Sequence, residues 1–195
     1  MVASTPSKRG AQAQERRNQL IDVARSLFAE KGMERTSIKE IAAAADVAQG
    51  LIYHYFRSKD ELFWAIIQRD NPMPVMMDVY AHAEGMPVRD FLIYAARTAF
   101  ATASERRDLI RIIIHETMAH PEMQQSLRGL QQMAIGMLSG YLTGRVAAGE
   151  LRPHDTQVSA RMLMGSVIAM LVTGLPPEPY IEQVVENLLH GIGAQ

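Results

Sequence analysis

The 195-residue sequence predicts an all-α fold, in which an N-terminal three-helix helix-turn-helix domain precedes a larger helical region. Apolar residues recur three and four positions apart along most of the chain, which is the spacing of one helix face. Serine, aspartate, glycine and proline stand where such segments begin and end. No segment alternates apolar and polar residues as a β-strand would. The chain has no cysteine, which excludes disulfides, cysteine-ligated zinc and a thiol nucleophile.

The first helix is expected over about residues 15–31. Its apolar face consists of Leu20, Ile21, Ala24, Leu27 and Phe28. Gly32 follows, at the position where a glycine commonly ends a helix in the left-handed conformation. Residues 1–14 are polar and cannot bury enough surface to order themselves, so they are expected to form a flexible arm.

Two short helices are expected next, in a helix-turn-helix arrangement. Ser37 and Glu40 have the spacing of a capping box, in which each side chain accepts from the other residue's backbone N–H, so a second helix starts there and continues through Ala45. Asp46 interrupts it. A third helix from Ala48 to Tyr55 follows, and the second helix of such a pair can project into the major groove of DNA.

A fourth helix is expected from Ser58, which caps it, to the proline-containing break at residues 71–74. It would connect the two parts of the chain. Glycine and proline breaks divide the remainder into further helices. These are expected near residues 75–83, 88–104, 106–119, 122–149, 155–174 and 178–190.

Charge is distributed unevenly along the chain. Residues 1–59 carry 10 Lys and Arg against 6 Asp and Glu, whereas residues 60–195 carry 10 against 15. A basic module on an acidic remainder is expected when only the first part meets phosphate. Polar residues interrupt every apolar run, so no membrane span is expected. Without a signal segment or cysteines, the cytoplasm is the expected location.

Three segments occur in a characteristic order: TSIKEIA at residues 36–42, VAQGLIYHYF at 47–56 and SKDEL at 58–62. Together they resemble the N-terminal signature of the tetracycline-repressor (TetR) family, over about residues 15–65. The resemblance implies a homodimeric transcriptional regulator, expected to be a repressor, that binds double-stranded operator DNA. It also implies a DNA-binding domain over residues 15–60 and an effector-binding and dimerisation domain over residues 61–195.

The resemblance further implies which residues meet DNA. They are Ser37, Lys39, Gln49, Gly50, Leu51, Tyr53, His54 and Lys59. The chemistry of these side chains agrees, because glutamine can form two hydrogen bonds with adenine and leucine can contact the methyl group of thymine. Tyrosine and histidine offer donors to phosphate oxygens.

Structural alternatives remain open for several of these residues. Tyr53 and His54 could instead form a solvated surface. Other residues of the segment, namely Ile52, Tyr55 and Phe56, are expected in the core. Further cations are expected to be solvated and to add only non-specific affinity, namely Lys8, Arg9, Arg16, Arg17 and Arg57. The sequence departs from the family pattern at Asp46, Ala48 and Leu51, which leaves the operator sequence open.

Similarity in the C-terminal region is faint and is confined to residues 111–116, 120–123 and 149–153. The resemblance implies dimerisation through the helices at about 155–174 and 178–190. Small residues there suit close approach between helices, either in the dimer or within the chain's own core. They are Ala160, Gly165, Ser166 and Ala169.

The same resemblance implies an effector pocket in this region. Of 13 methionines, many lie where such pockets form, although a buried methionine usually only fills space. We therefore expect a small apolar or aromatic effector. The candidate pocket residues are Met77, Arg97, Thr98, Thr102, His115, Met118, Met133, Met137, Tyr141 and Met164.

The sequence does not favour an enzyme, a cofactor or a metal site. His115 and His120 flank a glutamate as in a zinc-protease helix, but they are five positions apart, about 140° around the helix, and cannot share an ion. Ser166 lacks the motif of a hydrolase nucleophile. Two alternatives stay open: a constitutive DNA-binding protein without effector, and a helical enzyme or interaction module that carries the DNA-binding motif.

Overall fold

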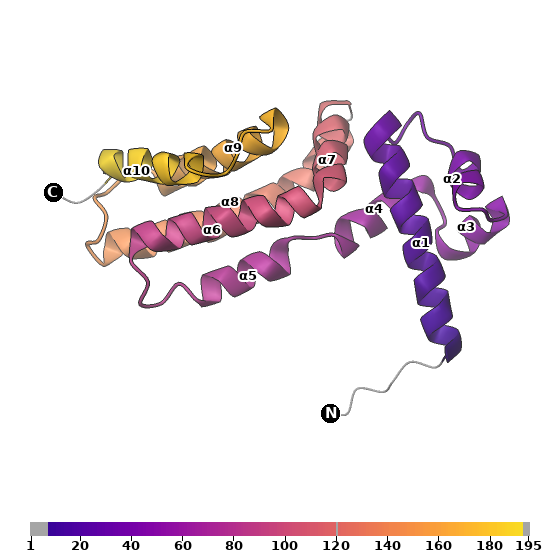
Figure 1. Ribbon diagram of the computed structural model, residues 1–195, viewed down its shortest axis with the longest axis horizontal. Helices are drawn as coiled ribbons and strands as arrows, with labels where there is room; N and C mark the ends of the chain where they lie inside the picture. The colour runs from indigo at the N-terminus through magenta and orange to yellow at the C-terminus, as the bar shows by residue number, and fades with distance from the viewer. Residues whose placement is uncertain (1–7, 120, 193–195) are drawn as a thin grey trace. The chain divides into compact units, whose positions relative to one another are not determined.

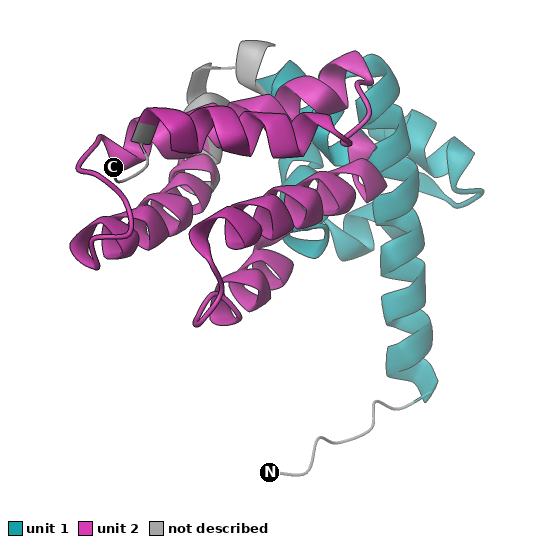
Figure 2. Ribbon diagram, turned by 60° about the vertical axis from the view of Figure 1, so that its left-hand side comes forward, with its two compact units in different colours: residues 1–71, 108–121 teal, residues 72–107, 122–195 magenta. Residues whose placement is uncertain are grey.

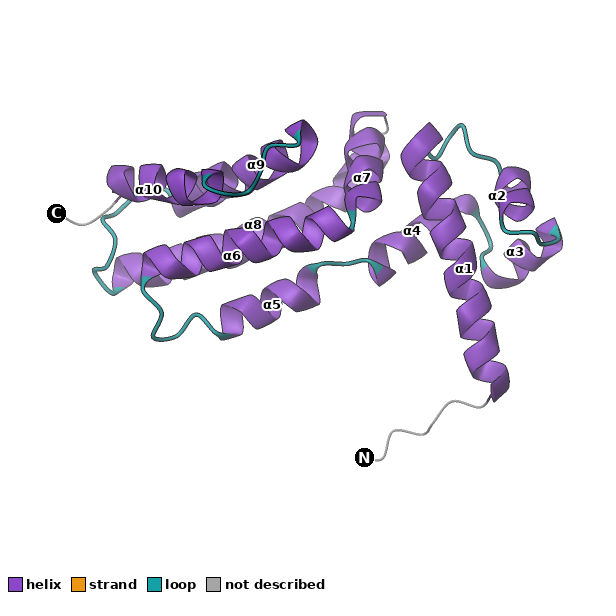
Figure 3. Cartoon of the chain, viewed as in Figure 1, coloured by secondary structure: helices purple, strands orange, loops and turns teal. Residues whose placement is uncertain are grey.

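A computed structural model describes residues 8–119 and 121–192. These residues form helices joined by loops and contain no β-strand (Figure 3), so the all-α prediction is confirmed. The helices are α1 (Lys8–Lys31), α2 (Ile38–Ala44), α3 (Gln49–Tyr55), α4 (Lys59–Arg69), α5 (Met73–Ala81), α6 (Val88–Glu105), α7 (Arg107–Ala119), α8 (Pro121–Ala147), α9 (Thr156–Thr173) and α10 (Tyr180–Ile192). Most boundaries lie within two residues of those expected. α1 begins earlier than expected. Residues 8–14, which were expected to belong to the flexible arm, continue the helix that was expected to start near residue 15.

Contacts divide the chain into two compact units (Figure 2). Unit 1 comprises residues 1–71 and 108–121, and unit 2 comprises residues 72–107 and 122–195. The sequence analysis placed a domain boundary at residue 60. The division by contacts instead groups α4 and α7 with the helix-turn-helix segment.

The core of unit 1 forms where α2 and α4 pack against α1 (Figure 1). Each helix contributes one apolar face, as the sequence periodicity predicts. The buried residues are Leu20, Ile21, Ala24 and Phe28 of α1, Ile41 and Ala42 of α2, Ile52 of α3, and Leu62, Phe63, Ala65, Ile66 and Ile67 of α4.

An ion network joins the end of α4 to α1. The Arg25 guanidinium lies 3.0 Å from the buried Asp70 carboxylate, which also accepts from Arg69 at 2.9 Å. Arg69 in turn lies 2.8 Å from Asp22. Burial by itself would raise the pKa of Asp70, but the hydrogen bonds from Arg69 and Arg25 outweigh it and lower the pKa. The network therefore favours the charged carboxylate and fixes where α4 ends.

α7 is held against the C-terminal end of α1 through a buried carboxylate. Glu116 is fully buried and accepts a hydrogen bond of 2.9 Å from the backbone N–H of Met33. Beside it, the His115 ring packs on Gly32, where an added Cβ would lie 2.6 Å from the ring. Gly32 also has a φ of +84°, so the position requires glycine for both conformation and space.

Unit 2 has its own core, built by α6 together with α5, α9 and α10. Three aromatic rings form a cluster within it: the ring of Phe91 lies 4.0 Å from that of Tyr141 and 5.3 Å from that of Tyr80, between ring centroids. Arg145 extends over the Tyr141 ring and donates to the backbone carbonyl of Ala83. α8 is thereby tied to the loop between α5 and α6.

α9 is apolar on two faces. Its core face buries Ala160, Leu163, Val167 and Met170. Its other face exposes Val158, Met162, Ile168 and Val172. Among the residues that the structure describes, α9 is the one helix long and apolar enough to cross a membrane by length and composition, although no span was expected. The sequence analysis expected no span because polar residues, here Arg161, interrupt the apolar run.

The predicted capping box at the start of α2 is confirmed. The Ser37 Oγ accepts from the Glu40 backbone N–H at 3.1 Å, and the Glu40 carboxylate accepts from the Ser37 backbone N–H at 2.8 Å. The hydrogen bonds from the Ser37 backbone and hydroxyl, with that from the Lys31 ammonium, lower the pKa of Glu40 from 4.5 to about 2. The charged carboxylate therefore belongs to the folded state.

This capping box should make stability fall in acid. A pKa that is depressed on folding stabilises the protein above pH 4.5, and the contribution is lost as the pH falls from 4.5 to about 2. Glu40→Gln can still accept the hydrogen bond from the Ser37 backbone N–H, but it loses the ion pair with Lys31 and cannot titrate. Urea unfolding at a series of pH values should show a smaller loss of unfolding free energy between about pH 5 and pH 3 for this variant than for the wild type.

The matched control is Glu30→Gln, which removes one exposed carboxylate of α1 outside the capping box. It should retain the acid dependence of the wild type. Parallel pH profiles for wild type and Glu40→Gln would contradict the assignment.

Candidate nucleic-acid interface

The turn between α2 and α3 sets the angle of the second helix. Asp46 has a φ of +52°, in the left-handed region that aspartate tolerates better than most residues. The next backbone N–H, of Val47, donates back to the Ala42 carbonyl at 3.0 Å. Ala48 is the N-cap of α3 and forms no side-chain cap. The start of α3 therefore leaves backbone N–H groups without a protein side chain to accept from them.

The two faces of α3 have opposite environments. Ile52 is fully buried, and Phe56, directly after the helix, is 1% exposed, so both belong to the core as expected. Tyr55 is half-buried. The other face is open to solvent and carries Gln49, Gly50, Tyr53 and His54, with the Tyr53 side chain 52% exposed.

The remaining predicted DNA contacts lie around this face. Ser37 and Lys39 are exposed at the start of α2, and Leu51 is half-buried on α3. Lys59 is also half-buried, and its Nζ donates to the backbone carbonyls of Thr36 at 3.1 Å and Glu34 at 3.3 Å. Its ammonium thus braces the loop before α2, a role that sequence reasoning did not anticipate.

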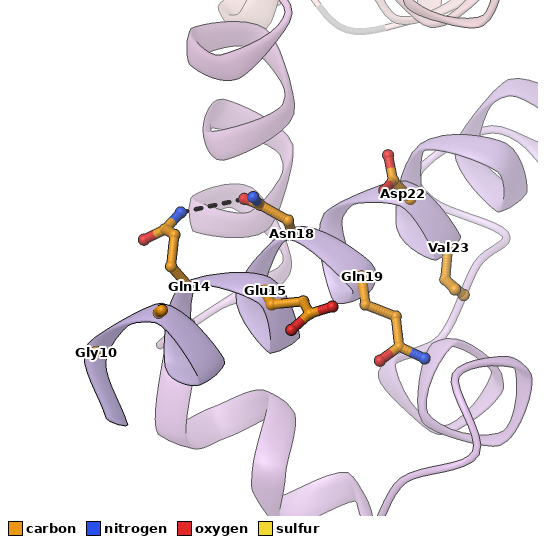
Figure 4. Close-up of a pocket in the computed structure, with 8 residues that line it drawn as sticks. Gly10, Gln14, Glu15, Asn18, Gln19, Asp22 and Val23 are labelled. Carbon is orange, nitrogen blue, oxygen red and sulfur yellow. Dashed lines mark hydrogen bonds between the residues drawn. The ribbon is translucent and has the colours of Figure 1, made fainter. Parts of the chain in front are cut away.

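Two hollows lie along α1. One, of about 600 Å³, lies between α1 and α3 and is lined by Gln12, Ala13, Glu15, Arg16, Gln19, Leu51 and Tyr55. The other, of about 800 Å³, is lined by residues of α1 alone (Figure 4). Within it, Gln14 donates to Asn18 at 3.1 Å. A hollow lined by one face of a single helix is an open surface depression and does not enclose a ligand.

The candidate effector residues differ in how deeply they are buried. Tyr141 and Met164 pack against the core of unit 2, Thr102 is buried, and Thr98 and Met137 are half-buried. These five residues are the candidates that are buried or half-buried within unit 2.

The other candidates are exposed at the surface or lie outside unit 2. Met77 and Met133 are 63% and 56% exposed, and Arg97 forms ion pairs with Glu178 and Glu182 at the surface. His115 belongs to unit 1. The side chain of Met118 lies outside the described residues.

The α7 segment that resembles a zinc-protease motif makes contacts within the fold instead. Glu116 accepts from the backbone N–H of Met33, and His115 packs on Gly32, whereas His120 lies outside the described residues. In the part of the chain that is described, no cluster of three or more His, Asp or Glu side chains could hold a metal ion.

Comparison with known proteins identifies both parts of the chain. The family model for bacterial regulatory proteins of the tetR family matches residues 20–66. The model for the AefR-like transcriptional repressor C-terminal domain matches residues 92–184. The first of these includes the whole helix-turn-helix segment described above.

Curated relatives and solved structures agree with these models. The regulator AcrR of Shigella flexneri is 36% identical over 186 residues, covering 91% of this chain and 80% of that protein. The repressor BepR of Brucella suis is 27% identical, covering 91% and 88%. Salmonella enterica GusR has a TM-score of 0.73 at 25% identity, covering 90% of this chain and 94% of that one. A tetR-family protein from Rhodococcus has a TM-score of 0.76 at 20% identity, covering 97% and 100%.

The exposed face of α3, the supporting helices and these relatives lead to one conclusion. The enzyme alternative is excluded, because the relatives and the matching families are regulators of transcription. The chain belongs to the TetR family of bacterial transcriptional regulators, which bind DNA through a helix-turn-helix.

Proposed function

We propose that this regulator represses transcription in the cytoplasm by binding a near-palindromic operator as a homodimer, and that a small apolar or aromatic effector releases it. The observation that carries the DNA-binding part is the two-faced α3. Burial of Ile52 and Phe56 leaves Gln49, Tyr53 and His54 pointing away from the core. A helix held in this way can enter the major groove with its polar face against the bases.

Four side chains of α3 have separate roles in the proposed contact. Gln49 at the start of α3 reads an adenine through two hydrogen bonds, and Leu51 meets a thymine methyl group. Tyr53 and His54 donate to phosphate oxygens. Apart from its chain neighbours and the backbone of its own helix, no described atom lies within 4 Å of a Cβ added at Gly50, so the space beside it is free for the duplex.

α2 and α4 would support this contact from the side. Ser37 and Lys39 lie exposed at the start of α2, where they hold the backbone of the duplex. Lys59 acts through the loop that it braces, because its Nζ already donates to two carbonyls. Contacts to phosphate fix the register of the protein, whereas contacts to bases select the sequence.

The apolar stripe on α9 supports the homodimer. Val158, Met162 and Val172 are 50%, 58% and 63% exposed, and Gly165 and Ala169 lie exposed between them. These positions are spaced four, three, four and three residues apart, which is the repeat of a helix-packing seam. Large exposed side chains with glycine and alanine between them suit a second helix at close distance.

A dimer of this kind would present two copies of α3 to DNA. Recognition helices bind successive major grooves when they are about 34–36 Å apart, so a two-fold dimer reads a near-palindrome. An effector can release DNA only if it binds the DNA-incompetent form more tightly than the competent form. The core of unit 2 consists largely of apolar side chains, with the aromatic cluster of Tyr80, Phe91 and Tyr141 among them, which supports an apolar or aromatic effector.

Selection of bound sequences from random duplex DNA tests operator binding directly. The purified protein should enrich an inverted repeat. Gln49→Ala should weaken binding to it by about 1–3 kcal/mol and relax preference at one base pair of each half-site. Tyr53→Phe should weaken binding with little change in preference, because it removes a phosphate contact.

Gln68→Ala is the matched control, since it makes the same substitution at an exposed glutamine of α4. It should bind as the wild type does. Absence of enrichment by a folded dimer would contradict the proposal.

A charge placed in the α9 stripe should break the dimer. Met162→Asp buries a carboxylate in the proposed interface, which costs several kcal/mol when the charge has no partner. Analytical ultracentrifugation should show a monomer at concentrations where the wild type is dimeric. Gln132→Asp introduces the same side chain at an exposed position of α8 and should remain a dimer. A Met162→Asp protein that still sediments as a dimer would place the interface elsewhere.

Thermal shift with fatty acids, phenols and aromatic hydrocarbons tests the effector. A ligand at about 100 times its Kd should stabilise the protein by about 2.7 kcal/mol through mass action. The same ligand should lower affinity for the enriched duplex. If no compound changes either quantity, a constitutive DNA-binding protein becomes the better description.

A further inference from the structure

The first three turns of α1 lie outside the core of unit 1. α1 begins by Lys8, but its first buried residue is Leu20, and residues 8–16 are all exposed. In Figure 1 this part of α1 continues toward the N-terminus beyond the segment that packs with the other helices of unit 1. We call residues 8–16 the α1 extension. Packing against its own core does not account for its helical structure.

One face of the α1 extension is basic. At 100° per residue, Lys8, Arg9, Gln12 and Arg16 fall within an arc of about 100° around the helix axis. Among the described residues, no carboxylate forms an ion pair with Lys8, Arg9 or Arg16, and Arg16 donates to the Gln19 side chain at 2.7 Å. Arg17 differs, because its guanidinium packs over the Phe56 ring at 5.0 Å from the ring centroid.

This basic face adjoins the recognition helix. Gln12 and Arg16 line the hollow of about 600 Å³ together with Leu51 and Tyr55 of α3. Glu15 is the one acidic residue in the lining. Because α3 enters the major groove in the proposed complex, residues across this hollow from Leu51 face the edge of the same groove. The edge of a groove is a phosphate backbone.

We infer that the α1 extension is a second DNA-contacting element, in which Lys8, Arg9 and Arg16 neutralise phosphates that flank the groove occupied by α3. Charge complementarity and continuity with α3 favour duplex DNA as the occupant of this face. From Arg9 to Arg16 the helix rises about 10 Å, or roughly three base pairs. The contacted site is therefore longer than α2 and α3 alone would make it. This inference rests on the proposed operator binding.

The proposed contact predicts how strongly DNA affinity depends on salt concentration. Each neutralised phosphate contributes about 0.9 to the slope of log K against log salt concentration. A dimer carries every substitution twice. Arg9→Gln and Arg16→Gln should therefore each lower the slope by about 2 and weaken binding equally on the enriched operator and on an unrelated duplex of the same length. Gln49→Ala should instead weaken binding to the operator selectively.

The experiment uses the full chain and fluorescence anisotropy of both duplexes over a range of KCl concentrations. Arg16→Lys keeps the charge and should retain the slope. Arg152→Gln removes one exposed cation from unit 2 and controls for net charge. Circular dichroism should show unchanged melting, because the substituted side chains are exposed.

The outcomes separate this inference from the proposal on which it rests. Unchanged slopes for Arg9→Gln and Arg16→Gln, in a protein that binds its operator, would overturn the α1 extension as a DNA contact. An equal loss of slope in Arg152→Gln would also overturn it, because net charge would then explain the effect. Failure of the wild type to bind any duplex would instead overturn the proposed function.

Discussion

The orientation of α3 depends on the burial of Ile52 and Phe56. A helix of seven residues is too short to be stable by itself in water, because too few hydrogen bonds offset the cost of its first turn. At most 1% of either residue's surface is exposed to solvent. Packing therefore determines both that α3 is a helix and which of its faces is open, and the exposed positions of Gln49 and Tyr53 follow from it.

α1 is the helix to which three other helices of unit 1 are joined. The same helix packs with α2, joins α4 through the ion network around Asp70, and at its C-terminal end meets α7 through the hydrogen bond from Met33 to Glu116. The chain passes between the two units after residues 71, 107 and 121. α4 and α7 both lie next to such crossings and are both fixed to α1. In the proposed mechanism, an effector in unit 2 would act through these covalent links.

α9 shows why an apolar helix need not belong to a membrane. Its buried face packs the core of unit 2, and its exposed face has the spacing and the small residues of a seam between helices. Either face alone would make the helix amphipathic. Two apolar faces together give it the composition of a span, and a second copy of the chain would cover the face that the first leaves exposed.

Apart from the start of α1, the sequence by itself determined the helices to within a few residues, and it determined the capping box of Ser37 and Glu40, because periodicity and end signals act over short distances. It also determined that Ile52 and Phe56 are buried. Tertiary structure alone decided that Lys59 braces a loop and that Glu116 is buried against Met33, since both contacts join residues far apart in sequence. The α1 extension was within reach of the sequence, because its cations repeat at helical spacing. Only the tertiary structure placed this face beside α3, and with it beside the proposed DNA contact.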